Sequence, residues 1–226
     1  MCFVTFSSSV LNVFDRSWVL AFAGMSGNGT LTQKLTLYFA PGASSMAPHI
    51  ALNEIGAPFE AVPMSFHQND TRAADFLAVN PEGKVPTLLI DGRALTEVAG
   101  ILYYLARRYP EARLMPLGDP EAEARVISWM SFAASAIHPA RKQGLEHAMA
   151  VYEIADKRLG DADWLVGDYS IADIHLFRLY WRFAASLKPP PGSFPRLEAH
   201  HARMLARPAV IRTIEAEAAI GYELPA

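Results

Sequence analysis

The spacing of hydrophobic residues changes near the middle of the chain. From Leu35 to about residue 110, apolar runs of four to six residues alternate with stretches of helical periodicity, and turn-forming residues separate them. Beyond residue 119, apolar positions recur only every three to four residues, which is typical of amphipathic helices. We therefore expect a mixed α/β domain followed by an all-helical domain.

The first domain has the pattern of a small mixed sheet. We expect a strand at 35–39, a helix at 44–55 and a second strand at 59–64, an order that makes the two strands parallel. After a short helix at 71–79, "VPTLLI-DG-RAL" combines two strand-like runs with the Asp-Gly turn of a β-hairpin. A helix at 97–109 completes a four-stranded sheet covered by helices.

Apolar periodicity predicts five helices in the second domain, separated by Gly, Pro or polar residues. They run over residues 120–138, 145–159, 170–187, 195–206 and 208–219. Three prolines in "YPEARLMPLGDP" indicate a linker before the first of them. The expected limits are residues 34–110 for the first domain, 111–119 for the linker and 120–226 for the helical domain.

The stretch "GDYSIADIHLF" contains a signal for the start of a helix. Ser170 is followed three residues later by Asp173, the spacing of a capping box, in which each side chain bonds to backbone at the other position. The residues that follow are apolar nearly all round, so we expect this helix at the centre of its domain. Asp173 is accordingly expected to be structural and not catalytic.

Residues 1–33 lack a sustained pattern. The apolar run "SWVLAFAG" is too short to span a bilayer, and no basic residue stands in the "MCFVTFSSSV" that begins the chain, as a signal peptide would require. We expect a disordered extension, or sequence upstream of a start at Met25.

Composition limits the classes of function. With 51% apolar residues the chain can form a substantial core, while 20 basic and 23 acidic residues give a net charge of −3. This balance offers no broad cationic field for nucleic acid or an anionic membrane. The single cysteine, Cys2, excludes an intrachain disulfide and a CxxC pair, so a reducing, cytoplasmic location fits best. The histidines lack the spacing of metal ligands. We expect no metal.

Four separated motifs carry a resemblance to a known family. They are "LYFAPGASSMAPHIALNEIG", "NPEGKVPTLLIDGRALTE", "SIADIHLF" and "FPRLEAHHARMLARPAV". In this order they resemble cytosolic glutathione S-transferases, most closely the bacterial beta class, over about residues 35–219. The resemblance implies a thioredoxin-like N-terminal domain, a helical C-terminal domain, glutathione as co-substrate and a homodimer.

The resemblance also places glutathione. In this family the residue before a cis-proline offers its backbone to the cysteinyl part of glutathione, and that pair here is Val85-Pro86. Glu97 would bind the ammonium group of the ligand, and the Val98 N–H its γ-glutamyl carboxylate. The alternatives are an ordinary trans proline and a solvated glutamate in a first helical turn. Many relatives carry serine at the position of Val98, so one hydroxyl, worth about 1 kcal/mol of binding, is lost.

The thiol of glutathione would lie near two serines. Ser44 stands where beta-class enzymes carry a cysteine, and a hydroxyl there can donate a hydrogen bond to a thiolate favoured by the helix dipole. Ser45 is the neighbour that can serve instead, and Tyr38, at the end of the first strand, is a further candidate. The alternatives are that both serines only cap the helix and that Tyr38 only packs.

The second substrate would contact the helical domain. His138 falls near the position of an active-site histidine of beta-class relatives, although the local match "SAIHPARK" is loose and a structural histidine is the alternative. Arg141 and Lys142 can neutralise an acidic co-substrate or form a solvated basic turn. The stretch between His138 and Tyr152 is short for the family, which would open this pocket.

The resulting hypothesis is a glutathione transferase, in which the thiolate of bound glutathione attacks a small electrophile. A glutathione-dependent isomerase or dehalogenase is a close variant. The alternative from another class is a non-catalytic binding or regulatory protein with the same fold, which the loss of the cysteine and the presence of Val98 favour. A thioredoxin-type oxidoreductase is disfavoured because no active-site cysteine exists.

Overall fold

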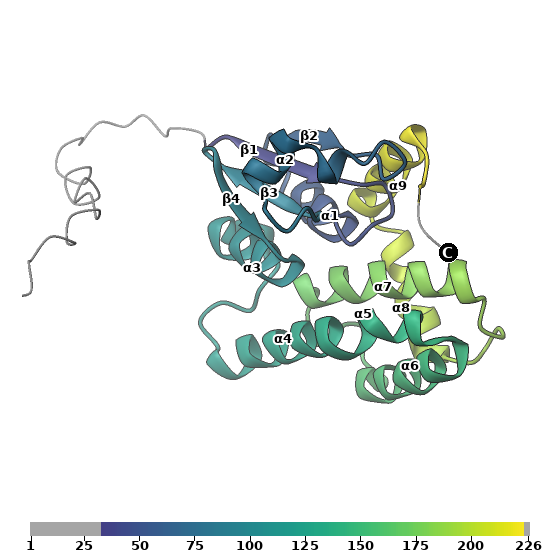
Figure 1. Cartoon of the computed structure of the whole chain (residues 1–226). Coiled ribbons are helices and arrows are strands. Elements are labelled where there is room, and N and C mark those ends of the chain that lie inside the picture. Colours follow the sequence, from purple (N-terminus) through teal and green to yellow (C-terminus); the bar gives the residue numbers. More distant parts are fainter. Residues whose placement is uncertain (1–32, 224–226) are drawn as a thin grey trace, which may run out of the picture. The chain divides into compact units, whose positions relative to one another are not determined.

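Four strands of the first domain form one sheet in the order β2-β1-β3-β4 (Figure 1). The structure is a computed structural model and describes residues 33–223. The strands are β1 (Leu35–Phe39), β2 (Glu60–Pro63), β3 (Thr87–Ile90) and β4 (Arg93–Thr96). As expected, β1 and β2 are parallel and β3 and β4 form an antiparallel hairpin, while β1 and β3 run antiparallel.

The helices of this domain also follow the predicted order. They are α1 (Met46–Ile55), η1 (Asp70–Arg72), α2 (Ala74–Val79) and α3 (Val98–Arg108). The strand β1 alternates: Leu35, Leu37 and Phe39 enter the core with α1 and α3, whereas the ring of Tyr38 packs against Phe76 of α2. This mixed sheet with helices is the expected thioredoxin-like fold.

The second part of the described chain is helical. Its elements are η2 (Pro110–Ala112), α4 (Pro120–Phe132), η3 (Ala133–Ile137), α5 (His138–Ala140), η4 (Arg141–Gln143), α6 (Leu145–Leu159), α7 (Ile171–Leu187), α8 (Pro195–Leu205) and α9 (Pro208–Ile220). The predicted helix at 120–138 is therefore one rod with a π-helical turn, η3, before His138. The limits of the two domains stay predictions. The extension expected at 1–33 lies outside the described residues, except for Gln33.

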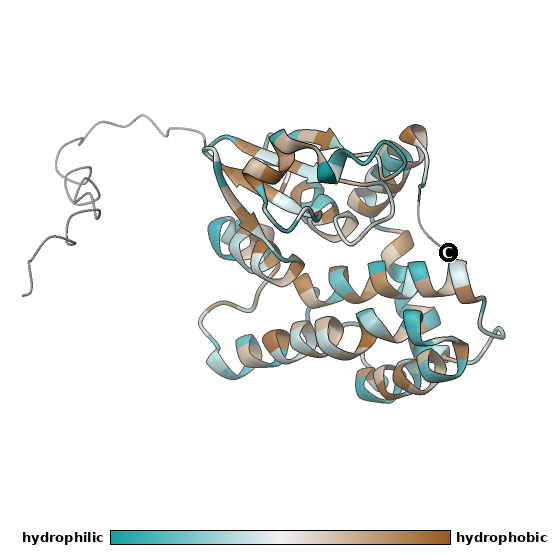
Figure 2. Cartoon of the chain, in the orientation of Figure 1, coloured by the Kyte–Doolittle hydropathy of each residue, from teal (hydrophilic) through white to brown (hydrophobic). Residues whose placement is uncertain are grey.

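The helix α7 lies at the centre, as its apolar sequence predicts. It packs against α1, α3, α4 and α8, and every residue from Ile171 to Tyr180 is buried. Figure 1 shows the sheet with α1 and α9 on one side of α7 and α4 and α6 on the other. Hydrophobic and hydrophilic segments alternate along the helices in Figure 2, as expected of helices with one buried face. No helix within residues 33–223 is long and apolar enough to cross a membrane.

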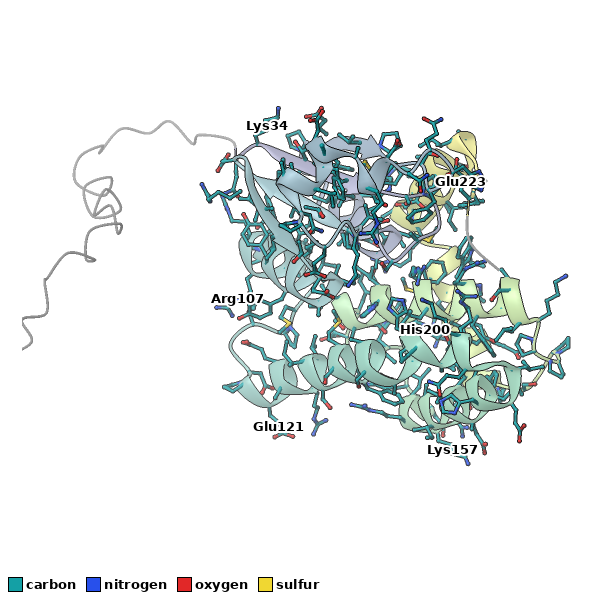
Figure 3. The ribbon with its side chains drawn as sticks, viewed as in Figure 1. Lys34, Arg107, Glu121, Lys157, His200 and Glu223 are labelled. Atoms are coloured by element: carbon teal, nitrogen blue, oxygen red, sulfur yellow. The ribbon has the colours of Figure 1, made fainter. Side chains whose placement is uncertain are left out.

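The capping box at the start of α7 is present. Ser170 Oγ accepts a hydrogen bond from Ala172 N at 3.3 Å, and Asp173 Oδ2 accepts one from Ser170 N at 2.9 Å. The other oxygen of Asp173 bonds to Leu165 N and to His200 Nε2, both at 3.0 Å. His200 lies among the helices in Figure 3, whereas the labelled side chains of Glu121 and Lys157 lie at the outer edge. Asp173 is thus a structural junction, as predicted.

We predict that Asp173→Ala lowers the free energy of unfolding by about 3 kcal/mol, because the buried Ser170 and His200 and the half-buried Leu165 lose their acceptor. Urea denaturation followed by circular dichroism measures the loss. Asp163→Ala is the matched control, since the Asp163 side chain is 75% exposed in its ion pair with Arg203, and it is expected to cost less than about 0.5 kcal/mol. Equal losses in the two variants would contradict the structural role.

Candidate active site

A tight loop at residues 40–45 carries the two serines from β1 into α1. Gly42 has φ 71°, in the left-handed region that glycine adopts without strain. Inside the loop, Ser45 Oγ accepts a hydrogen bond from Ala40 N and donates one to Ala40 O, both at 3.1 Å, and Ser45 is fully buried. Neither serine side chain caps α1. Ser45 therefore fixes the loop, and Ser44 is left at its surface.

Two charged side chains from distant helices hold this loop. Glu217 of α9 accepts a hydrogen bond from Gly42 N at 2.6 Å and shares its other oxygen with His49 Nδ1 at 2.9 Å. Arg178 of α7 donates to Gly42 O and to Ala43 O, both at 3.0 Å. Burial lowers the pKa of Arg178 to about 10, so the guanidinium keeps its charge at neutral pH. The loop is thus fixed on both sides by the helical part of the chain.

The turn before β3 meets this loop. The Val85-Pro86 peptide bond is cis, as expected, and Ser44 Oγ donates a hydrogen bond to Val85 O at 3.2 Å. The side chain of Asn80 holds the turn by donating to Lys84 O at 2.9 Å. Gly83 is required here, because a Cβ at this position would lie 2.6 Å from the backbone oxygen of Thr71. The hydroxyl of Ser44 is therefore next to the backbone of Val85.

Glu97 enters α3 in a strained conformation. Its φ of 66° is unusual for a residue with a side chain and costs on the order of 1–3 kcal/mol. The strain places an exposed carboxylate at the start of the helix, and Glu97 forms no ion pair within residues 33–223. Val98 follows as the first helical residue and is buried. Strained residues of this kind cluster at ligand sites.

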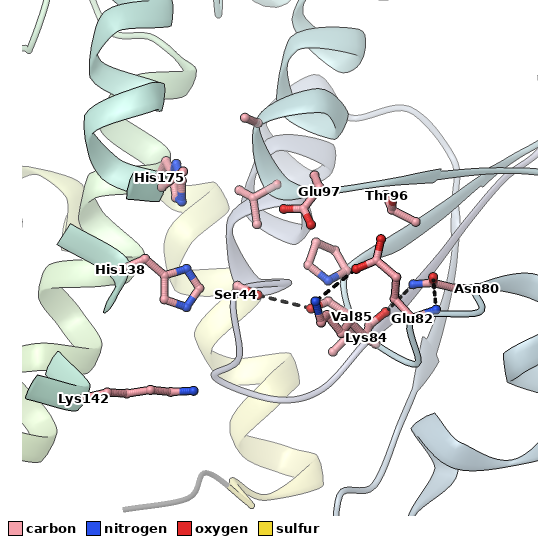
Figure 4. A pocket seen from close by; sticks show the side chains of 14 residues that line it. Ser44, Asn80, Glu82, Lys84, Val85, Thr96, Glu97, His138, Lys142 and His175 are labelled. Carbon is pink, nitrogen blue, oxygen red and sulfur yellow. Dashed lines mark hydrogen bonds and ion pairs between the residues drawn. The ribbon is translucent and has the colours of Figure 1, made fainter. Parts of the chain in front are cut away.

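These elements surround one pocket of about 330 Å³ (Figure 4). The first domain contributes Ser44, Asn80, Glu82, Lys84, Val85, Pro86, Thr96, Glu97, Val98 and Ala99, and the helices contribute Ala134, His138, Lys142 and His175. In Figure 4 the side chains of His138, Lys142 and His175 face those of Ser44 and Glu97 across the opening. The pocket size is in the range of small-ligand sites. The described residues include no group of three metal-ligating side chains.

Two family models match this chain. "Glutathione S-transferase, N-terminal domain" matches residues 33–107, and "Glutathione S-transferase, C-terminal domain" matches residues 123–208. The chain belongs to the glutathione S-transferase family. It is 30% identical to Glutathione S-transferase GstA of Escherichia coli O157:H7 over 203 residues, which cover 81% of this chain and 98% of that relative.

Solved structures of the family agree. A sphingomonad glutathione S-transferase complexed with glutathione is 34% identical with a TM-score of 0.74, covering 81% of this chain and 98% of that one. A bacterial beta class glutathione S-transferase from Sphingomonas chungbukensis is 36% identical with a TM-score of 0.71, covering 80% and 98%. These matches confirm the expected family and fold and support the expected transferase activity.

The structure brings most of the predicted glutathione S-transferase site residues together. Ser44, Val85, Pro86, Glu97, Val98 and His138 line the pocket described above. Arg141 lines a recess that also contains Ser44 and His138. The short connection after His138, a single 3₁₀ turn followed by Gly144, places Arg141 and Lys142 at these walls.

Two predicted residues lie elsewhere. Ser45 is buried beneath the loop, where its hydroxyl is occupied by Ala40, and it does not line the pocket. Tyr38 is also absent from the lining, because it points to the face of the sheet covered by α2 and packs against Phe76 at a ring distance of 5.3 Å. The structure therefore favours Ser44 over Ser45 and the packing alternative for Tyr38.

Sequence reasoning missed three buried polar residues: His175, Arg178 and Glu217. Each interrupts an otherwise apolar helix face, and such an interruption is the signal that would have identified them. His175 is 1% exposed and lines the pocket, and neither of its ring nitrogens has a hydrogen-bond partner among the described residues. A buried polar group without a partner is rare and points to a role.

The two histidines of the pocket are neutral at pH 7. Desolvation, followed by the charges of Arg178, Lys142 and Arg141, lowers the pKa of His138 to about 4. His138 itself is exposed at the opening of the pocket, and the three cations add to the effect of desolvation. Desolvation, followed by His138 and Arg178, lowers the pKa of His175 to about 3.

We predict that His175 makes the fold acid-sensitive. Its pKa is lower in the folded chain than the ordinary 6.5, so its contribution to stability is complete above pH 6.5 and is lost as the pH falls towards 3. Between pH 7 and pH 5 the wild type should lose about 2 kcal/mol more unfolding free energy than His175→Gln. Urea denaturation at the two pH values measures this, with His147→Gln, at an exposed position, as the control. A wild type and His175→Gln that lose equal amounts would contradict the assignment.

Proposed function

We propose that this chain is a glutathione transferase in which Ser44 stabilises the thiolate of bound glutathione. The observation that carries the proposal is the position of Ser44 Oγ, 3.2 Å from Val85 O, in one pocket with the Glu97 carboxylate and the start of α3. Solved relatives include a glutathione S-transferase complexed with glutathione. Glutathione is accordingly the co-substrate in this proposal.

Each part of glutathione then has a partner of matching chemistry. The backbone of Val85 faces the cysteinyl unit, which it can bind as an added strand. The Glu97 carboxylate binds the ammonium group, and the Val98 N–H at the positive end of α3 binds the γ-glutamyl carboxylate. Because Val98 has no hydroxyl, one hydrogen bond to this carboxylate is missing. The hydroxyl of Ser44 then donates a hydrogen bond to the sulfur of glutathione.

The local charges favour a thiolate at Ser44. A hydrogen bond to a charged group is worth about 1.5–3 kcal/mol, which corresponds to one to two pKa units of a thiol. Ser44 also stands before the N-terminus of α1, and it shares a recess with Lys84, Arg141 and Arg178. These groups would lower the pKa of the glutathione thiol from about 8.5 towards neutrality.

The thiolate then attacks an electrophile held on the helical side, near His138 and Arg141. The enzyme raises the thiolate population and orients the two reactants, and no covalent enzyme intermediate is involved. A homodimer in the cytoplasm is part of the proposal, because the family resemblance implies both. Binding of glutathione without turnover of any electrophile would instead favour a non-catalytic member of the family.

We predict that Ser44→Ala raises the apparent pKa of enzyme-bound glutathione by one to two units, with little change in the melting temperature. Thiolate absorbance of the bound ligand, titrated against pH, measures the shift. Ser44→Thr keeps a hydroxyl and is the matched control, with a titration close to that of the wild type. An unchanged titration in Ser44→Ala would remove Ser44 from the mechanism.

A second prediction concerns Ser44→Cys. A thiol at this position should form a mixed disulfide with oxidised glutathione, because its sulfur would lie where the glutathione sulfur is expected. Intact-protein mass spectrometry detects the adduct, with wild type as the background for Cys2. Ser131→Cys, at an exposed position outside the pocket, controls for unspecific reaction. Equal modification of the two variants would contradict the proposed placement of the sulfur.

A further inference from the structure

Cationic side chains gather beside Ser44. The recess that contains Ser44 and Val85 is also lined by Lys84, Arg141, Arg178 and Arg182, and encloses about 260 Å³. A neighbouring recess is lined by Arg141, Lys142, Arg178 and Arg182, and His138 belongs to both. No carboxylate is among the described residues that line either one. This concentration of positive charge stands out in a chain whose net charge is −3.

Three of these cations lack a carboxylate partner. Within residues 33–223, Arg141, Lys142 and Arg178 form no ion pair, whereas nine other arginines and lysines do. Arg178 is buried, and its guanidinium donates to the carbonyl oxygens of Gly42 and Ala43, while the Glu217 carboxylate acts on it from a distance without forming an ion pair within residues 33–223. Buried charges are normally paired, so a site of this kind favours an anion.

His175 adds an independent observation. It lies on α7 one helical turn before Arg178 and lines the wall of the pocket shared with His138 and Lys142. Its ring is buried and has no hydrogen-bond partner within the described residues. A neutral imidazole always keeps one N–H donor, and a bound oxygen atom would give this donor a partner. Cations and an unused donor therefore occupy the same side of the cleft.

We propose that the electrophile taken by this cleft carries a carboxylate, which Arg141 and Lys142 bind while its reacting carbon faces Ser44. This inference rests on the proposed function, since it names the substrate class of the same site. Arg178 adds charge from the buried side, and His175 donates a hydrogen bond to a polar atom of the substrate. For an aryl halide, the thiolate forms the C–S bond and halide leaves with the C–halogen electron pair.

Glutathione itself has carboxylates, so the test must separate binding of the glutathione carboxylates from binding of the carboxylate of the electrophile. The probes are 4-chloro-3,5-dinitrobenzoate and its neutral analogue 4-chloro-3,5-dinitrobenzamide, with kcat/KM for each divided by its uncatalysed rate with glutathione. We expect the wild type to favour the carboxylate about tenfold and added salt to reduce this preference. The double variant Arg141→Gln/Lys142→Gln should lose the preference, and any change in the thiolate of glutathione affects both probes equally.

The matched control is Arg125→Gln/Lys157→Gln, which removes the same charge from exposed ion pairs on the outer faces of α4 and α6. Figure 3 shows Lys157 at the outer edge of the helices. The control should keep the wild-type preference. Turnover of both probes without a preference, or an equal loss in the control, would overturn the inference and leave the transferase function standing.

A binding measurement separates the two proposals. The S-aryl glutathione conjugates of the two probes are titrated by calorimetry, which needs no turnover. If the anionic conjugate binds more tightly than the neutral one and the Arg141→Gln/Lys142→Gln variant loses this difference, the inference is supported. If neither probe reacts in addition, the transferase proposal fails while the inference stands. Equal binding of the two conjugates overturns the inference. His175→Leu, which removes the donor, should weaken the anionic conjugate severalfold, whereas His175→Gln should weaken it less.

Discussion

The position of Ser44 in the candidate active site depends on the hydrogen bonds that α7 and α9 make with the loop at residues 40–45. Arg178 donates to the carbonyl oxygens of Gly42 and Ala43, and Glu217 accepts a hydrogen bond from the Gly42 N–H that precedes them. The donors and acceptors of a tight turn, which would otherwise face solvent or remain unpaired, are thereby satisfied by buried side chains. The first domain supplies the serine, but the second domain fixes its place.

The elements of this fold are local enough to be predicted. Strand alternation in 35–39, the Asp-Gly turn and the Ser170-Asp173 box each depend on residues a few positions apart, and the structure has all three. The contacts that fix the loop before Ser44 are different, because Arg178 and Glu217 lie more than 130 residues away and no local pattern links them to Gly42 and Ala43. A helical pattern also treats His175 as one polar residue in an apolar run. Its place in the pocket becomes visible only when the helices are packed.

The two sides of the cleft carry opposite charges. Glu97 gives one end a negative charge, while Arg141, Lys142 and Arg178 give the opposite side a positive one. A ligand with an ammonium group at one end and negative groups elsewhere is oriented by such a field before close contacts form. The overall charge of −3 conceals this division, which explains why composition gave no hint of a local cluster of cations.

The π-helical turn at Ala133–Ile137 determines the direction in which the side chains after it in the same helical segment point. An α-helix advances about 100° per residue, and a π turn takes one residue more than an α turn to complete a hydrogen-bonded ring. One additional residue thereby rotates His138 and the cations that follow it around the helix axis. The direction in which His138 points therefore depends on a backbone irregularity five residues long and not on the regular repeat of the helix.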